Sequence, residues 1–122
     1  MSKPFMQVAA SRLLRALRLA GQVTERKNTV PILDYLLIDA RDGAVRVTAT
    51  DWDCEFSQSV EAEVDAPTTL ALPTHKLLQI ASAVPKDAFL RFTLPDNDRV
   101  SVTSGRTRFV VPSISAGEFP RF

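Results

Sequence analysis

The sequence predicts an α+β domain in which two helices cover one face of a mainly antiparallel sheet. Three observations favour this class. The hydrophobic period changes twice from strand-like to helix-like, each helical segment is followed by three strand-like segments, and no linker or low-complexity tract divides the 122 residues. The order strand, helix, three strands therefore occurs twice, as a structural duplication of a unit of about sixty residues without a convincing residue-level repeat.

The first unit contains segments with a strand-like hydrophobic period and one with a helix-like period. Its predicted elements are a strand over 5–9, a helix over 12–23 and strands over 34–42, 44–50 and 55–65. Ser11 is predicted as the helix N-cap, and Gly21 lies near the helix end. Asp42-Gly43 is typical of a tight hairpin turn. Alternation is clearest in the last strand, where one face is apolar except for Gln58 and the other face is acidic and polar.

The second unit repeats this order. Its predicted elements are a strand over 68–72, a helix over 73–84 and strands over 89–94, 99–104 and 107–111. Pro73 opens the helix and Pro85 closes it. The last three strands are joined by predicted turns at residues 95–98 and at Ser104-Gly105.

Composition places the chain among soluble globular domains, since 45% of its residues are hydrophobic and 24% are charged. The single cysteine, Cys54, excludes an intrachain disulfide, and the N-terminal residues lack an apolar signal core. The uncharged stretch over 77–85 is too short to span a bilayer. We therefore expect a reduced, cytoplasmic protein without a membrane segment.

The formal net charge of +1 argues, taken alone, against a nucleic-acid binder, but it hides an uneven distribution. The net charge is +5 over residues 1–27, −7 over 28–65, +2 over 66–86 and +1 over 87–122. This pattern predicts a two-faced domain with its bases on helices and its acids on strands.

Both predicted helices are basic on the side opposite their apolar residues. In the first, a helical projection separates Arg12, Arg15, Arg18 and Gln22 from Leu13, Ala16, Leu17 and Ala20. In the second, it separates His75, Lys76, Gln79, Ser82 and Lys86 from Leu77, Ile80, Ala81 and Val84. Such bases suit phosphate backbones without base readout, although a solvated basic face without a ligand explains the charge alone equally well.

No pattern indicates an enzyme. His75 is the only histidine, so a zinc site with two imidazoles is excluded, and Cys54 lies in no nucleophile motif. Asp51 and Asp53 are interpreted as solvated turn residues, and no glycine belongs to a phosphate-binding loop. We expect no catalytic residue, no metal and no cofactor.

Several motifs, in order and with their spacing kept, resemble one family. They are Arg26-Lys27-Asn28-Thr29-Val30-Pro31-Ile32-Leu33, Val47-Thr48-Ala49-Thr50-Asp51, Leu72-Pro73-Thr74-His75-Lys76-Leu77, Ser104-Gly105-Arg106-Thr107-Arg108-Phe109 and Gly117-Glu118-Phe119-Pro120. Together they resemble the first domain of the bacterial DNA polymerase III beta subunit, the sliding clamp. The resemblance implies the DNA-clamp fold and a non-catalytic processivity factor of DNA replication, a ring that encircles duplex DNA without sequence specificity and tethers the replicative polymerase.

The resemblance also implies roles for individual residues. DNA-binding positions fall on Arg12, Arg15, Arg18, Arg26 and Lys27. The head-to-tail contact with a second clamp subunit falls on the bases Lys76, Arg99, Arg106 and Arg108 and on the apolar residues Phe109 and Val111. The strand over 107–111 would then be an exposed sheet edge that needs a partner.

The resemblance covers residues 1–122 as a single domain, the first of three in a clamp subunit. The parts that would bind polymerase and clamp loader are missing from this chain. We therefore expect a domain of a clamp; the alternative is a stand-alone relative that acts as a protein-interaction module or a weak DNA-binding module.

Overall fold

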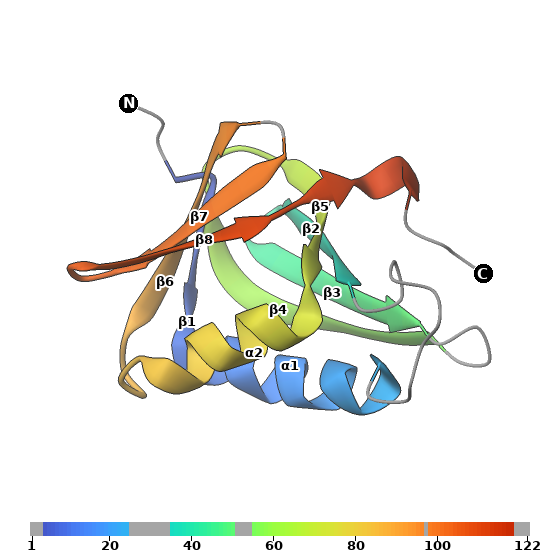
Figure 1. The fold of residues 1–122 in the computed structure, drawn as a ribbon, viewed down its shortest axis with the longest axis horizontal. Coiled ribbons are helices and arrows are strands. Elements are labelled where there is room, and N and C mark those ends of the chain that lie inside the picture. The colour runs from blue at the N-terminus through green and yellow to red at the C-terminus, as the bar shows by residue number, and fades with distance from the viewer. Residues whose placement is uncertain (1–3, 25–34, 51–54, 97, 119–122) are drawn as a thin grey trace.

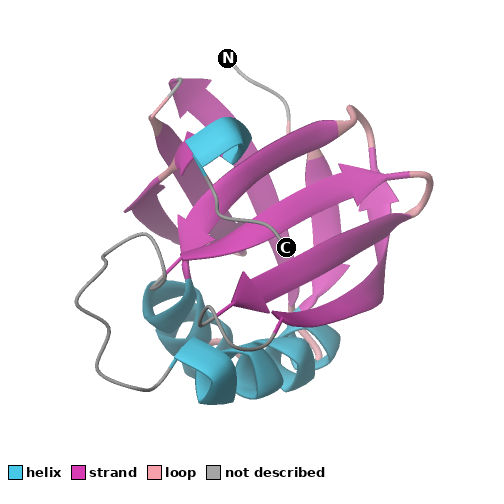
Figure 2. Ribbon diagram, turned by 90° about the vertical axis from the view of Figure 1, so that its right-hand side faces the viewer, coloured by secondary structure: helices cyan, strands magenta, loops and turns pink. Residues whose placement is uncertain are grey.

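The computed structural model describes residues 4–24, 35–50, 55–96 and 98–118. Two helices lie against one side of a strongly curved sheet (Figure 1), and the view turned by 90° shows the strands stacked above the helical layer (Figure 2). The predicted α+β class and the twofold strand-helix-strand-strand-strand order are both confirmed. Among the described residues, no helix is long and apolar enough to cross a membrane.

The elements follow the two predicted units. The first unit consists of β1 (Met6–Ala9), α1 (Ala10–Thr24), β2 (Tyr35–Arg41), β3 (Ala44–Thr50) and β4 (Glu55–Val64). The second consists of β5 (Thr68–Pro73), α2 (Thr74–Ala83), β6 (Phe89–Asp96), β7 (Arg99–Ser104) and β8 (Thr107–Pro112). A two-residue strand, β9 (Ile114–Ser115), and a 3₁₀ turn (Ala116–Glu118) follow.

The strands form one antiparallel sheet in the order β8-β7-β6-β1-β4-β3-β2-β5-β9. Each unit contributes its first strand to the other unit's side of the sheet, since β1 pairs with β6 and β5 pairs with β2. β1 also pairs with β4, and this pairing joins the two halves. Because the chain crosses between the halves in this way, neither unit can complete its hydrogen bonding alone.

The core lies between the sheet and the helical layer. The apolar side of α1 is buried as predicted, through Leu13, Ala16, Leu17 and Ala20, and α2 buries Leu77, Ile80 and Ala81. Phe92 on β6 has no exposed surface, and its ring centroid lies 6.3 Å from that of Phe5. Burial of these continuous apolar sides is the main stabilising contribution to the fold.

Two hairpin turns depend on backbone geometry that the sequence indicated. Asp42 and Gly43 have φ angles of 53° and 77°, the pair of positive values that a type I′ turn requires between β2 and β3. Gly105, at the turn between β7 and β8, has a φ of 58°. Both predicted hairpins are therefore confirmed, and their short loops set the register of the strands that they join.

The structure corrects several boundaries. Ser11 is not the N-cap of α1, because the helix starts at Ala10, directly after β1, where the Ala10 amide donates a 2.9 Å hydrogen bond to the Ala88 carbonyl. β6 continues to Asp96 through a register irregularity after Thr93, so the predicted turn over 95–98 is shorter than expected. β9 was not predicted, because two residues are too few to show a period.

Candidate nucleic-acid interface

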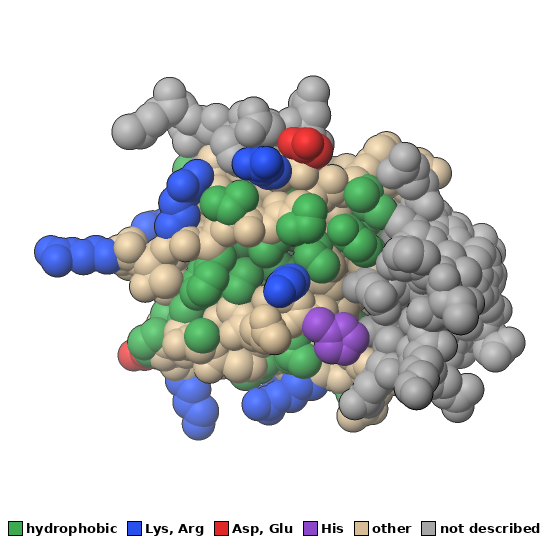
Figure 3. Space-filling view, in the orientation of Figure 1, with side chains coloured by type: hydrophobic (Ala, Val, Ile, Leu, Met, Phe, Trp, Pro, Cys, Tyr) green, Lys and Arg blue, Asp and Glu red, His purple; other side chains and the backbone are tan. Residues whose placement is uncertain are grey.

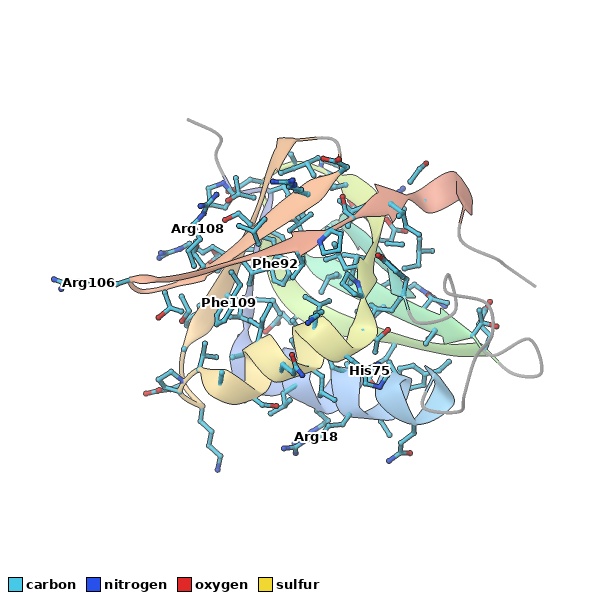
Figure 4. The ribbon with its side chains drawn as sticks, viewed as in Figure 1. Arg18, His75, Phe92, Arg106, Arg108 and Phe109 are labelled. Atoms are coloured by element: carbon cyan, nitrogen blue, oxygen red, sulfur yellow. The ribbon has the colours of Figure 1, made fainter. Side chains whose placement is uncertain are left out.

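The side of α1 that faces away from the sheet is basic. Arg12, Arg15 and Arg18 are all exposed, spaced by three residues so that they follow one side of the helix. Figure 4 shows Arg18 on the side of the helical layer remote from the sheet. The first turn of α1 contains no acid, so the positive end of the helix dipole is not neutralised there. This side of the molecule therefore favours anions.

Arg12 differs from the other two arginines, because its charge already has a partner. Its Nη1 donates a 2.7 Å hydrogen bond to Oε1 of Glu61 on β4. Both side chains are mostly exposed, 61% for Arg12 and 78% for Glu61, so the pair is accessible to solvent and to salt. Within the described part of the chain, neither Arg15 nor Arg18 has an ion-pair partner. The three predicted DNA-binding positions on α1 are therefore not equivalent.

A groove runs between the two helices on the same side. It has a volume of about 590 Å³, and its apolar lining comes from Ala10, Leu14, Leu19, Ala81 and Val84. Arg15, Arg18 and Lys86 add three bases to this lining, and Ser11 and Ser82 complete it. Among the described residues, no acid lines the groove, and its apolar surface is flanked by positive charge.

The remaining predicted DNA-binding positions, Arg26 and Lys27, lie outside the described residues. On α2, His75 and Gln79 are exposed, as the helical projection predicted. The structure therefore brings Arg12, Arg15 and Arg18 together on one side of the helical layer and leaves the other two positions as expectations.

The predicted separation of bases on helices from acids on strands is only partly correct. The strands of the second unit carry the exposed arginines Arg91, Arg99 and Arg108, and Arg106 is exposed in the turn between β7 and β8. In the first unit, Arg41 and Arg46 lie on the sheet face remote from the helices, where Arg41 pairs with Asp39 and the Nε of Arg46 donates to the Ser57 hydroxyl. The net charge of a segment does not reveal these bases, because acids of the same segment offset them in the sum.

The strand β8, which was predicted to be an edge of the sheet, lies at a sheet edge in the structure. β8 stands at one end of the sheet order, and its backbone ladder joins it to β7 alone among the described strands. Arg106 lies at the tip of the β7–β8 hairpin, and the Nε of Arg108 donates a 3.1 Å hydrogen bond to the Ser101 hydroxyl on β7. Figure 3 shows hydrophobic side chains gathered between β8 and α2, with basic side chains around them. An edge of this kind can accept another strand.

The structure separates the two predicted apolar residues of β8. Phe109 is partly buried and packs against the core, whereas Val111 is only 4% exposed and belongs to the core itself. Within this chain Val111 therefore does not form apolar surface. Val110, on the opposite face of the strand, is 46% exposed and is not among the predicted interface residues. Counting the strand alternation outward from the buried Val111 would have found it.

Comparison with known proteins identifies the family of this chain. The family model for the DNA polymerase III beta subunit, N-terminal domain, matches residues 5–122. The chain belongs to this family. A beta sliding clamp of Caulobacter vibrioides is 34% identical over 116 residues, which are 94% of this chain and 31% of that protein. A beta sliding clamp of Vibrio harveyi is 33% identical over 114 residues, 93% of this chain and 78% of the relative's sequence.

Solved clamp structures share the fold of this beta-subunit domain. The crystal structure of the DNA polymerase sliding clamp from Caulobacter crescentus superposes with a TM-score of 0.90 at 33% identity, over 96% of this chain and 32% of that chain. The DNA polymerase III subunit beta from Pseudomonas aeruginosa gives a TM-score of 0.87 at 25% identity, over all of this chain and 32% of that one. The beta-subunit domain thus spans about a third of these solved chains, and the predicted DNA-clamp fold is confirmed.

Proposed function

We propose that this beta-subunit domain forms part of a ring-shaped sliding clamp, a non-catalytic processivity factor that encircles duplex DNA and tethers the replicative polymerase. The observation that carries the proposal is the exposed basic side of α1, with Arg12, Arg15 and Arg18, in a domain of this family. The relatives matched over nearly the whole domain are beta sliding clamps, which supports the same role here.

The chemistry of the helical face suits sliding. Arginine side chains contact phosphates, which repeat along any duplex, and such contacts carry no sequence information. The exposed guanidinium groups are screened by salt, so each contact is weak and readily exchanged. A closed ring needs no tight grip, because enclosure keeps the DNA at a high effective concentration. A single open domain gains no enclosure and is expected to bind DNA poorly.

We further propose that the β8 edge joins a second subunit head to tail. Its bases Arg99, Arg106 and Arg108 would face acidic groups of the neighbour, with Lys76 of α2 nearby in the same role. Phe109 on one face of the strand and the exposed Val110 on the other would supply apolar surface to the contact. Polymerase and clamp loader would bind parts of the subunit that this chain does not contain. The cytoplasm is the proposed location, as for other replication proteins.

The salt dependence of duplex binding tests the proposed DNA contact. In the Arg15→Ala/Arg18→Ala variant, we expect the slope of log K against log salt to fall by about 0.9 for each lost phosphate contact. The Arg41→Ala/Arg46→Ala variant is the matched control, because it removes the same charge from the sheet face remote from the helices. Equal slopes for the two variants would contradict the DNA-facing assignment of α1.

A second candidate function, a stand-alone protein-interaction module, is favoured only by the exposed β8 edge. It predicts partner binding without any contribution from the helical face. A chain that binds proteins through Arg106 and Arg108 but shows no salt-dependent duplex binding would support this alternative over the clamp.

A further inference from the structure

Lys86 lines the interhelical groove together with Arg15 and Arg18 of α1, although it is far from both arginines in the sequence. The helices run antiparallel (Figure 1), so the residues after α2 return beside the first turns of α1. A contact at the other end of the helix pair agrees with this direction. A Cβ at Gly21, late in α1, would lie 3.9 Å from a methyl group of Leu78, early in α2. The fold thus places a third base at a groove that α1 alone would line with two.

The charges around this groove favour a polyanion. Lys86 is exposed, and no carboxylate from the described ranges of the chain lines the groove. Its neighbour in sequence, Asp87, is exposed but outside the groove lining, and the two form no ion pair within the described part of the chain. The first turn of α1 lies at the same end of the groove, and its helix dipole adds positive potential there. Three bases and a helix N-terminus therefore act together on whatever anion lies in the groove.

Arg12 takes no part in this arrangement. It does not line the interhelical groove, and its guanidinium is hydrogen-bonded to Glu61. A phosphate that approached Arg12 would compete with this carboxylate and meet its negative charge. The resemblance to clamps indicated Arg12, Arg15 and Arg18 as one row. In the structure, Arg15 and Arg18 line the interhelical groove with Lys86, whereas Arg12 and Arg15 line a neighbouring hollow that also contains Glu61, the ion-pair partner of Arg12.

We propose that Lys86 is a phosphate-binding residue of this domain, and that Arg15, Arg18 and Lys86 hold the duplex backbone along the groove between α1 and α2. This inference rests on the proposed function. The apolar floor holds water less strongly than a polar floor would, which strengthens the attraction between the flanking bases and a phosphate. The bases come from different elements, so their spacing is set by helix packing and not by the conformation of one segment.

Backbone amide shifts of the ¹⁵N-labelled 122-residue chain, titrated with a short duplex of mixed sequence, test the inference even if binding is weak. We expect Lys86→Glu to raise Kd about three- to tenfold and to lower the slope of log K against log salt by about 0.9. Lys86→Arg should keep wild-type binding, because it keeps the charge. Arg46→Glu changes the net charge equally on the remote sheet face and is the control.

The outcomes separate the inference from the proposed function. If Lys86→Glu weakens binding no more than Arg46→Glu while Arg15→Glu weakens it clearly, Lys86 is not a contact and the inference is overturned. If neither Lys86→Glu nor Arg15→Glu differs from the control, the proposed DNA face is wrong as a whole. A wild-type titration without shifts on α1 and around Lys86 would overturn both.

Discussion

Nη1 of Arg12 lies 2.7 Å from Oε1 of Glu61, which links the basic side of α1 to the acidic face of β4. The two residues are 49 positions apart, so their contact follows from the packing of the helix on the sheet. Because both side chains are largely exposed, the pair contributes only about 0–1 kcal/mol to stability. Its main effect is on charge, since it places a carboxylate at one end of the surface proposed to meet DNA.

Replacing Glu61 by Gln should strengthen duplex binding. The substitution removes the carboxylate that holds Arg12 and makes this guanidinium available to phosphate. We expect Kd at low salt to fall about two- to fivefold, with the free energy of unfolding changed by no more than about 1 kcal/mol. Glu63→Gln removes the same charge from the next outward position of β4 and is the control. Equal gains for both variants would show that only net charge matters.

Phe92→Ala should destabilise the domain severely. The side chain is fully buried and packs beside Phe5, so truncation leaves a cavity between sheet and helices. We expect the free energy of unfolding to fall by about 3–5 kcal/mol, measured by urea denaturation. Leu19→Ala is the comparison, because Leu19 is 41% exposed and should lose less than about 1 kcal/mol. Similar losses at both positions would contradict the described core.

Gly43→Ala should destabilise the β2–β3 hairpin through the backbone alone. The φ of Gly43 is 77°, and an added Cβ would meet no atom within 4 Å, so the expected loss of about 1–2 kcal/mol comes from the left-handed conformation. Gly117→Ala is the matched control, because Gly117 lacks a positive φ and its Cβ would make only an ordinary contact with Ser115. Thermal unfolding of both variants compares the two effects, and an unchanged midpoint for Gly43→Ala would argue against the type I′ turn.

Val110 and Val111 should respond differently to substitution. Val111→Ala removes core volume and should lower the free energy of unfolding by about 1–3 kcal/mol. Val110→Ser should leave the fold intact but weaken assembly in a subunit that carries this domain together with its partner surface. Denaturation and light-scattering mass distinguish the two. Loss of assembly without loss of stability in Val111→Ala would restore the role that the family resemblance assigned to this residue.

Arg106→Glu combined with Arg108→Glu should prevent ring assembly in such a subunit. Arg106 is exposed at the tip of the β7–β8 hairpin and Arg108 on the edge strand β8, and reversing both charges would oppose the acidic groups expected on the neighbour. The expected result is a light-scattering mass of one subunit where the parent forms a dimer. The double variant Arg41→Glu/Arg46→Glu has the same net charge and should still assemble. A dimer that survives the β8 substitutions would remove these arginines from the interface.

Most of the fold was predictable because each element shows its own period. The alternation of β3 and β4 and the two-sided pattern of α1 depend on neighbours within one element, and their apolar sides are buried as expected. β9 and the continuation of β6 past Thr93 were not predictable, since they depend on pairing with β5 and β7. Ser11 was misplaced because a strand leads directly into α1, without the intervening cap residue that the sequence pattern suggested.

The α+β class, the duplicated unit, the basic side of α1 and the family of the domain all followed from the amino-acid sequence. These properties are local or depend on motifs in order along the chain. Three features emerged from the folded domain alone: Glu61 pairs with Arg12, Lys86 joins Arg15 and Arg18 at one groove, and β8 exposes Val110 and not Val111. Electrostatics and burial depend on distance in space, and the chain crosses between the two halves of the sheet, so residues far apart in sequence become neighbours.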